Sequence, residues 1–76
     1  SELNNLLNHF KQKNDAAGTG AVQIRIGYLY NNLGDYNNSL KSLLSGLHNF
    51  EEIRDTTHII KCLDGISFSF LNSQNF

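Results

Sequence analysis

The chain has 76 residues, one cysteine and no proline, and its six basic and seven acidic residues leave a formal net charge of −1. This length allows one small domain with a thin core, one cysteine excludes an internal disulfide, and the balanced charge offers no electrostatic footprint for nucleic acid or anionic lipid. No apolar run approaches the roughly 20 residues of a membrane span, and the N-terminus lacks a signal-peptide pattern. We therefore expect a soluble, cytoplasmic protein with no nucleic-acid or membrane partner.

Apolar residues at helical spacing predict two helices in the first half of the chain. The first is short, and its stripe consists of Leu3, Leu6, Leu7 and Phe10. The second covers residues 16–33, follows the expected N-cap Asp15, and carries a stripe of Val22, Ile26, Leu29, Tyr30 and Leu33.

A Gly-Asp pair separates this helix from the next. Gly34 can adopt the left-handed conformation that closes a helix without Cβ strain. Asp35 can accept hydrogen bonds from the free N–H groups of the following first turn and faces the positive end of the helix dipole. A phosphate-binding loop needs several glycines and usually a lysine, so we interpret the pair as a helix stop and a helix start.

The second half of the chain predicts two further helices. One covers residues 36–53, with a stripe of Tyr36, Leu40, Leu43, Leu44, Leu47, Phe50 and Ile53. The other follows the expected cap Asp55, with a stripe of Ile59, Leu63, Ile66 and Phe70. The absence of proline and the placing of glycines between apolar runs favour helices over strands. The predicted fold class is therefore all-α, with four helices.

The chain also resembles itself at an offset of 40 residues. This offset places apolar residues on apolar residues and aromatic residues on aromatic residues, and it aligns the caps Asp15 and Asp55. The main pairs are Leu3 with Leu43, Leu7 with Leu47, Phe10 with Phe50, Ile26 with Ile66, Tyr28 with Phe68, Tyr30 with Phe70 and Tyr36 with Phe76. We interpret this as one whole repeat flanked by two half repeats.

The repeat carries a recognisable pattern of small and large residues: Ile26, Gly27, Tyr30, Gly34, Asp35, Tyr36, Ser39, Leu40, Gly46 and Leu47, with a weaker copy at Ile66, Ser67, Phe70, Asn75 and Phe76. This pattern resembles the signature of the tetratricopeptide repeat family. Two departures are Gln23, where an aromatic residue is usual, and the lack of a closing proline. The spacing of 40 exceeds the usual length of about 34 residues, which we attribute to longer helices around Phe50 to Ile60.

The resemblance implies antiparallel helix hairpins of an α-solenoid, in the order second, first, second, first helix. Residues 1–14 would be the second helix of a preceding repeat, 16–54 a complete repeat, and 55–76 the first helix of a following repeat. Helix packing would then involve Ile26, Gly27, Tyr30, Gly34, Tyr36, Ser39, Leu40, Gly46, Leu47, Ile66 and Phe70.

The same resemblance implies a groove for a protein or peptide partner. Its candidate lining residues are Ile24, Tyr28, Asn31, Asn32, Lys61, Asp64, Phe68 and Asn72. Rings give contact area at low entropic cost, and amides can pair with a peptide backbone. The alternative is that Tyr28 and Phe68 only cover neighbouring helices, as most helical aromatics do. Ile24 and Tyr28 replace the Lys and Asn of the carboxylate-clamp repeats, which disfavours a chaperone-tail binder.

No pattern indicates an enzyme, a cofactor or a metal site. His58 and Cys62 are four residues apart, but zinc needs further ligands that the neighbouring sequence does not supply. No strained turn presents a nucleophile.

The last helix is expected to leave one side of Ile66, Phe70 and Phe76 uncovered. A second copy of the chain could cover it, so we predict a homo-oligomer for the isolated chain. The lack of methionine predicts that the chain is a piece of a longer protein, and repeats of this length resemble those of bacterial signalling proteins. Two functions follow from these observations: a peptide-binding scaffold, or an oligomerisation or spacer segment without its own groove ligand.

Overall fold

The structure, a computed structural model, describes residues 2–74. These residues form four helices, α1 (Glu2–Gln12), α2 (Ala16–Asn32), α3 (Tyr36–Glu52) and α4 (Thr56–Ser73), and no strand. The predicted all-α fold is confirmed. The predicted ranges 16–33 and 36–53 each overrun the observed helix by one residue, because Leu33 and Ile53 are C-caps. Asn75 and Phe76, used in the predicted repeat, lie outside the described residues.

The three turns at residues 13–15, 33–35 and 53–55 share one design. Each ends in an aspartate whose carboxylate accepts a hydrogen bond from the backbone N–H three residues later, so all three predicted caps are confirmed. The residue before each aspartate has a positive φ: 57° at Asn14, 79° at Gly34 and 56° at Arg54. Gly34 therefore closes α2 in the left-handed conformation, as predicted.

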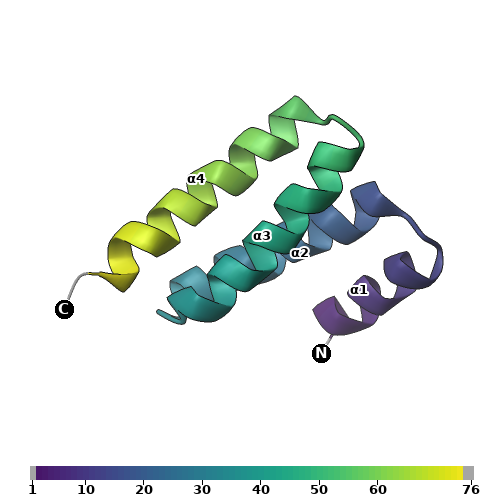
Figure 1. Ribbon diagram of the computed structural model, residues 1–76. Helices are drawn as coiled ribbons and strands as arrows, with labels where there is room; N and C mark the ends of the chain where they lie inside the picture. Colours follow the sequence, from purple (N-terminus) through teal and green to yellow (C-terminus); the bar gives the residue numbers. More distant parts are fainter. Residues whose placement is uncertain (1, 75–76) are drawn as a thin grey trace.

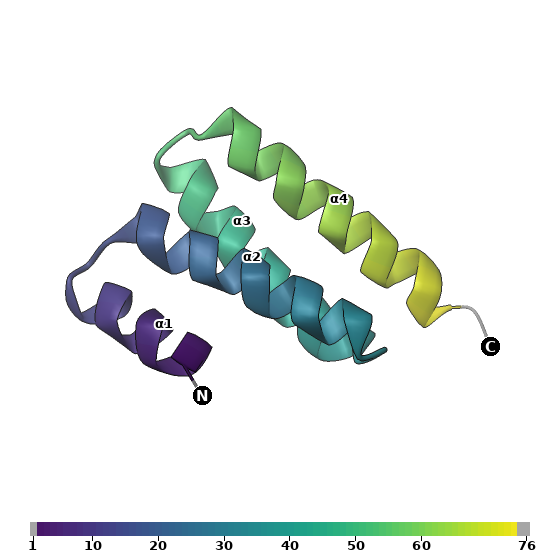
Figure 2. The same ribbon diagram turned by 180° about the vertical axis from the view of Figure 1, so that it is seen from behind.

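The helices form a flat molecule of 41 × 28 × 13 Å. Consecutive helices run in opposite directions, and α2 and α3 pack along most of their length (Figure 1). The view from behind shows α1 and α4 on opposite sides of the α2–α3 hairpin (Figure 2). Helix α4 packs on α3 and also touches α2, whereas α1 packs on α2. This arrangement brings α2 and α4 close together although they are distant in sequence.

Glycines allow the close approach of these helices. A Cβ on Gly27 would lie 2.6 Å from Leu43 Cγ, and a Cβ on Gly20 would lie 2.7 Å from Phe50 Cε2. Both distances are shorter than non-bonded carbon atoms approach in proteins. Larger residues in place of Gly27 or Gly20 would therefore force the helices apart. Leu43 and Phe50 are buried as a result.

The residues predicted to pack the repeat fall into three groups. Gly27, Ser39 and Gly46 are buried; the half-buried set contains Ile26, Tyr30, Tyr36, Leu40, Leu47 and Ile66; Gly34 and Phe70 are exposed. Gly34 serves the turn. The exposure of Phe70 agrees with the expectation that one side of the last helix is uncovered.

The segment from Phe50 to Ile60 is not one continuous helix, because α3 ends at Glu52, a turn covers residues 53–55, and α4 begins at Thr56. Helices α2 and α3 have 17 residues each and are followed by turns of three residues, which accounts for the spacing of 40. The attribution of this spacing to longer helices than those of the tetratricopeptide family stays a prediction. Within residues 2–74, no helix combines the length and apolar character needed to cross a bilayer.

Candidate functional site

An open hollow of about 290 Å³ lies between α2 and α4. Its lining residues are Tyr28, Asn31, Asn32, Asp64, Gly65 and Phe68. Five of these six were candidates from the sequence, and two helices separated by α3 in the chain supply them. We call this hollow the α2–α4 groove.

Tyr28 forms one wall of the groove. Its hydroxyl donates a hydrogen bond of 2.9 Å to the backbone oxygen of Lys61, which links α2 to α4. The ring passes so close to Gly65 that a Cβ there would lie 2.7 Å from Tyr28 Cε1. Partial burial raises the pKa of the Tyr28 hydroxyl, and the Asp64 carboxylate raises it further. The hydroxyl therefore stays protonated and remains a donor.

Phe68 forms the opposite wall and is 52% exposed. Its ring meets Tyr36 edge to face, with 6.4 Å between the ring centroids. Tyr28, in comparison, is 38% exposed. Each ring thus packs against a neighbouring helix on one side and faces the groove on the other, so helix packing leaves one side of each ring open.

Asn31 forms the floor and joins a buried hydrogen-bond network. Its carboxamide oxygen accepts a 2.6 Å bond from Ser69 Oγ, and its nitrogen donates across 3.4 Å to the backbone oxygen of Gly65. Ser39 Oγ lies 3.0 Å from Ser69 Oγ and donates to the backbone oxygen of Gly27 at 2.7 Å. The network connects α2, α3 and α4 directly beneath the groove.

The remaining candidates occupy different positions. Asn32 and Asp64 are exposed groove residues. Lys61 supplies its backbone oxygen to Tyr28, and the side chain of Asn72 donates to the backbone oxygen of Phe68 at 2.8 Å. Ile24 is only 7% exposed and packs with Phe50 and Cys62 in the core, away from the groove lining.

Gly65 is the groove residue that the sequence analysis missed. The signal lies in the sequence: Gly65 is the glycine of α4, and Gly27 and Gly46 are glycines that the residue pattern assigns to helix packing. A helical glycine in such a position predicts that a large residue of another helix packs against it, as Tyr28 does.

A second hollow, of about 350 Å³, adjoins the groove and shares Tyr28 and Asn32 with it. Leu3, Arg25 and Leu29 complete its lining. Together the two hollows make a longer track across α1, α2 and α4, and its lining includes Asp64 in the first hollow and Arg25 in the second.

His58 and Cys62 have structural partners. The His58 ring stacks on Phe50 with centroids 4.5 Å apart, and its Nδ1 lies 2.8 Å from Asp55 Oδ2. Cys62 is fully buried, and burial raises the pKa of its thiol. Among residues 2–74, no three His, Cys, Asp or Glu side chains are grouped so that they could hold a metal ion.

Comparisons of the chain with protein-family models, with curated proteins and with solved structures found no match.

Proposed function

We propose that this chain is a protein- or peptide-binding helical repeat scaffold of the tetratricopeptide kind, not an enzyme, and that its ligand lies in the α2–α4 groove. The observation that carries the proposal is the groove itself, with two part-exposed aromatic walls and a polar floor. Sites of this kind pair a few polar groups with apolar area and so fix both the position and the orientation of a ligand.

The recurrence of contacts at an offset of 40 residues supports the repeat part of the proposal. Phe10 packs against Gly18, where an added Cβ would clash with its ring, and Phe50 stacks on His58. Both pairs join the end of one helix to the start of the next. The likeness to the tetratricopeptide family rests on the residue pattern. These contacts are consistent with that pattern, because stacked repeats make equivalent contacts at equivalent positions.

The chemistry of the groove suits an extended peptide. Tyr28 and Phe68 offer ring surface to an apolar side chain, while the exposed Asn32 can pair with a peptide N–H or C=O. The adjoining hollow extends the track past Arg25. The opposite charges of Asp64 and Arg25 would favour one direction of the bound peptide over the other.

The second candidate function is an oligomerisation or spacer segment without a groove ligand. The observation that favours it is the number of large apolar side chains exposed outside the groove, among them Leu33, Leu44, Ile60 and Leu71. Exposed apolar surfaces of this kind commonly pack against neighbouring helices or against another chain.

Phage display of a random-peptide library against the immobilised protein tests the peptide-binding proposal. We expect the wild-type chain to select peptides whose binding weakens about tenfold or more in Phe68→Ala, because loss of an aromatic contact at the centre of an interface costs about 2 kcal/mol. Leu33→Ala is the matched control: Leu33 is 78% exposed and lies outside the groove lining.

Phe68 is a better probe than Tyr28, because Tyr28 also holds α2 to α4 through its hydroxyl. Circular dichroism should show that both variants keep the wild-type helix content. Failure to select any peptide, or equal loss of binding in both variants, would contradict the proposal and leave the spacer function.

A further inference from the structure

One face of α4 is apolar and uncovered. The exposed large residues on it and on the adjoining edge of α3 are between 47% and 69% exposed: Leu44, Ile60, Leu63, Phe70 and Leu71. We call this set the α4 face. Together these side chains leave on the order of 500 Å² of apolar surface in water, a size that on a monomer usually marks an interaction site.

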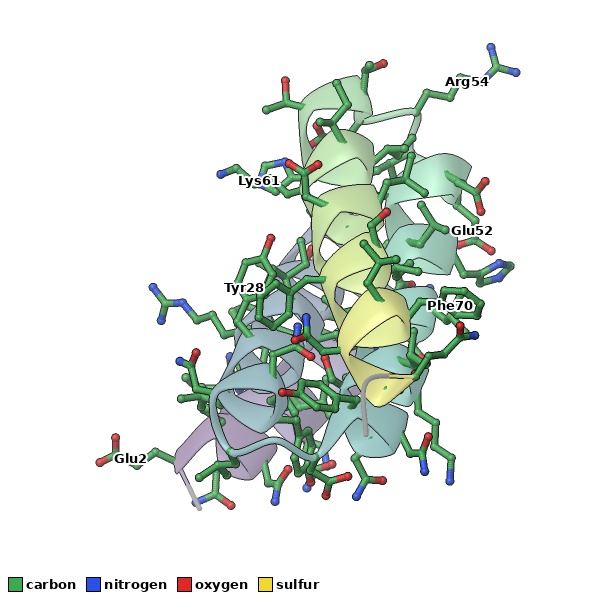
Figure 3. All side chains as sticks on the ribbon, turned by 90° about the vertical axis from the view of Figure 1, so that its left-hand side faces the viewer. Glu2, Tyr28, Glu52, Arg54, Lys61 and Phe70 are labelled. Carbon is green, nitrogen blue, oxygen red and sulfur yellow. The ribbon has the colours of Figure 1, made fainter. Side chains whose placement is uncertain are left out.

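The α4 face is separate from the groove. Figure 3 shows Phe70 and Tyr28 on opposite sides of α4, with Lys61 on the Tyr28 side. The two charged residues of α4, Lys61 and Asp64, both lie toward the groove side: Lys61 gives its backbone oxygen to Tyr28, and Asp64 lines the groove. Asp64 follows Ile60 by one helical turn, so its carboxylate borders the α4 face at the groove edge. The α4 face could still be covered while the groove stays open.

The spacing along the α4 face fits a second copy of the same helix. Ile60, Leu63, Ser67 and Phe70 follow one another at intervals of three, four and three residues, the spacing of the contact positions in a coiled coil. The intervals are three, four and three residues whether they are counted from Ile60 or from Phe70. An antiparallel copy of α4 therefore presents contact positions at the same spacing. Such self-complementarity is what a two-fold symmetric interface requires.

The side-chain sizes also match in the antiparallel arrangement. Ile60 would lie opposite the partner's Phe70, and Leu63 opposite the partner's Ser67, with the same two pairs repeated on the other side of the axis. A small residue then faces a large one in the two central layers, which lets the helices approach without voids.

We propose that two copies of this chain form a symmetric dimer through their α4 faces, with the two α4 helices antiparallel. The half-buried neighbours Leu40, Leu47, Ile59 and Ile66 border the α4 face, and with them the contact approaches the ~800 Å² per partner of a stable interface. The dimer carries both α2–α4 grooves on its outside, so it would bind a ligand with two peptide segments more tightly than one segment alone.

Sedimentation over a concentration series tests the proposal. The wild-type chain should sediment with twice the mass of one chain, and Leu63→Glu should raise the dimer dissociation constant by about a hundredfold or more, because two carboxylates become buried without partners. Leu33→Glu is the matched control, since it places the same charge on an exposed leucine outside the α4 face and should leave the dimer unchanged.

Engineered cysteines test the antiparallel orientation, and they do not depend on the folding of a charged variant. A mixture of the Leu63→Cys and Ser67→Cys chains, oxidised with glutathione disulfide, should form mainly the mixed cross-linked pair. The wild-type chain controls for the buried Cys62. A wild-type monomer at every concentration would overturn the dimer. Preferential cross-linking of Ser67→Cys to itself would overturn the antiparallel arrangement.

Discussion

At the scale of single residues, the molecule depends on a few polar side chains that bridge helices. Ser69 is fully buried and lies within hydrogen-bonding distance of Asn31, Ser39 and the Gly65 backbone. A buried polar group that loses its partner costs more than an average hydrogen bond contributes, because the orphaned group cannot return to water.

We therefore expect Ser69→Ala to lower the free energy of unfolding by about 1–3 kcal/mol. Ser73→Ala, in the same helix, removes an exposed hydroxyl that donates to the backbone oxygen of Phe70 and should change stability by less than about 0.5 kcal/mol. Urea unfolding of the wild type and the two variants, all at the same protein concentration, measures both changes in stability. Equal stability of the two variants would show that the network does not hold α4.

Asp55 makes the stability of α4 dependent on pH. The backbone N–H of His58 donates to its carboxylate and holds the pKa of Asp55 below its usual value, and the His58 side chain and the charge of Lys61 lower it further. Because the folded pKa is depressed, the stabilisation is fully present above the unfolded value of about 3.9. It is lost as the pH falls through the lower, folded pKa.

The thermal midpoint of the wild-type chain should therefore exceed that of Asp55→Asn at neutral pH, and the difference should shrink as the medium is acidified below about pH 4. Asparagine keeps a side-chain oxygen for the cap but not the charge. Thermal unfolding followed by circular dichroism at several pH values measures the difference. A gap that stays constant down to acid pH would contradict this role of the carboxylate.

At the scale of elements, the sequence predicted the helices well because their signals are local. Apolar periodicity set the helical stretches, and the aspartates at 15, 35 and 55 set their starts. The groove was harder to predict, since it depends on how closely α2 and α4 approach. That distance follows from Gly65 and from the bond between Tyr28 and the Lys61 backbone, neither of which periodicity reveals.

Ile24 illustrates the same limit. The family resemblance assigned it to the groove, but Phe50 and Cys62 surround it in the core. A rotation of α2 about its own axis by a fraction of a turn would move Ile24 from the core to the groove. Apolar spacing alone does not determine that rotation.

Helix α1 is the least secured element. It has 11 residues, contains no buried residue, and packs on α2 alone among the helices of residues 2–74. Segments with few buried apolar contacts open at low free energy without unfolding the rest. Hydrogen exchange should therefore show the amides of α1 exchanging well before those of α3, which is packed between α2 and α4. Equal protection of α1 and α3 would indicate a cooperative unit that includes all four helices.

At the scale of the whole molecule, each of the two proposed functions uses a different side of α4. The groove side carries the polar and aromatic side chains that suit a peptide, and the α4 face carries the apolar surface that suits a second copy. If both proposals hold, this division would let one short chain combine recognition with assembly, because covering one side of the helix leaves the other free.

The most direct test of peptide recognition is an NMR titration of nitrogen-15-labelled protein with a phage-selected peptide. We expect the amide shifts to concentrate at residues 28–32 and 64–68, the segments that line the α2–α4 groove. Shifts centred on Leu63, Phe70 and Leu71, with none at Tyr28 or Asn32, would contradict it.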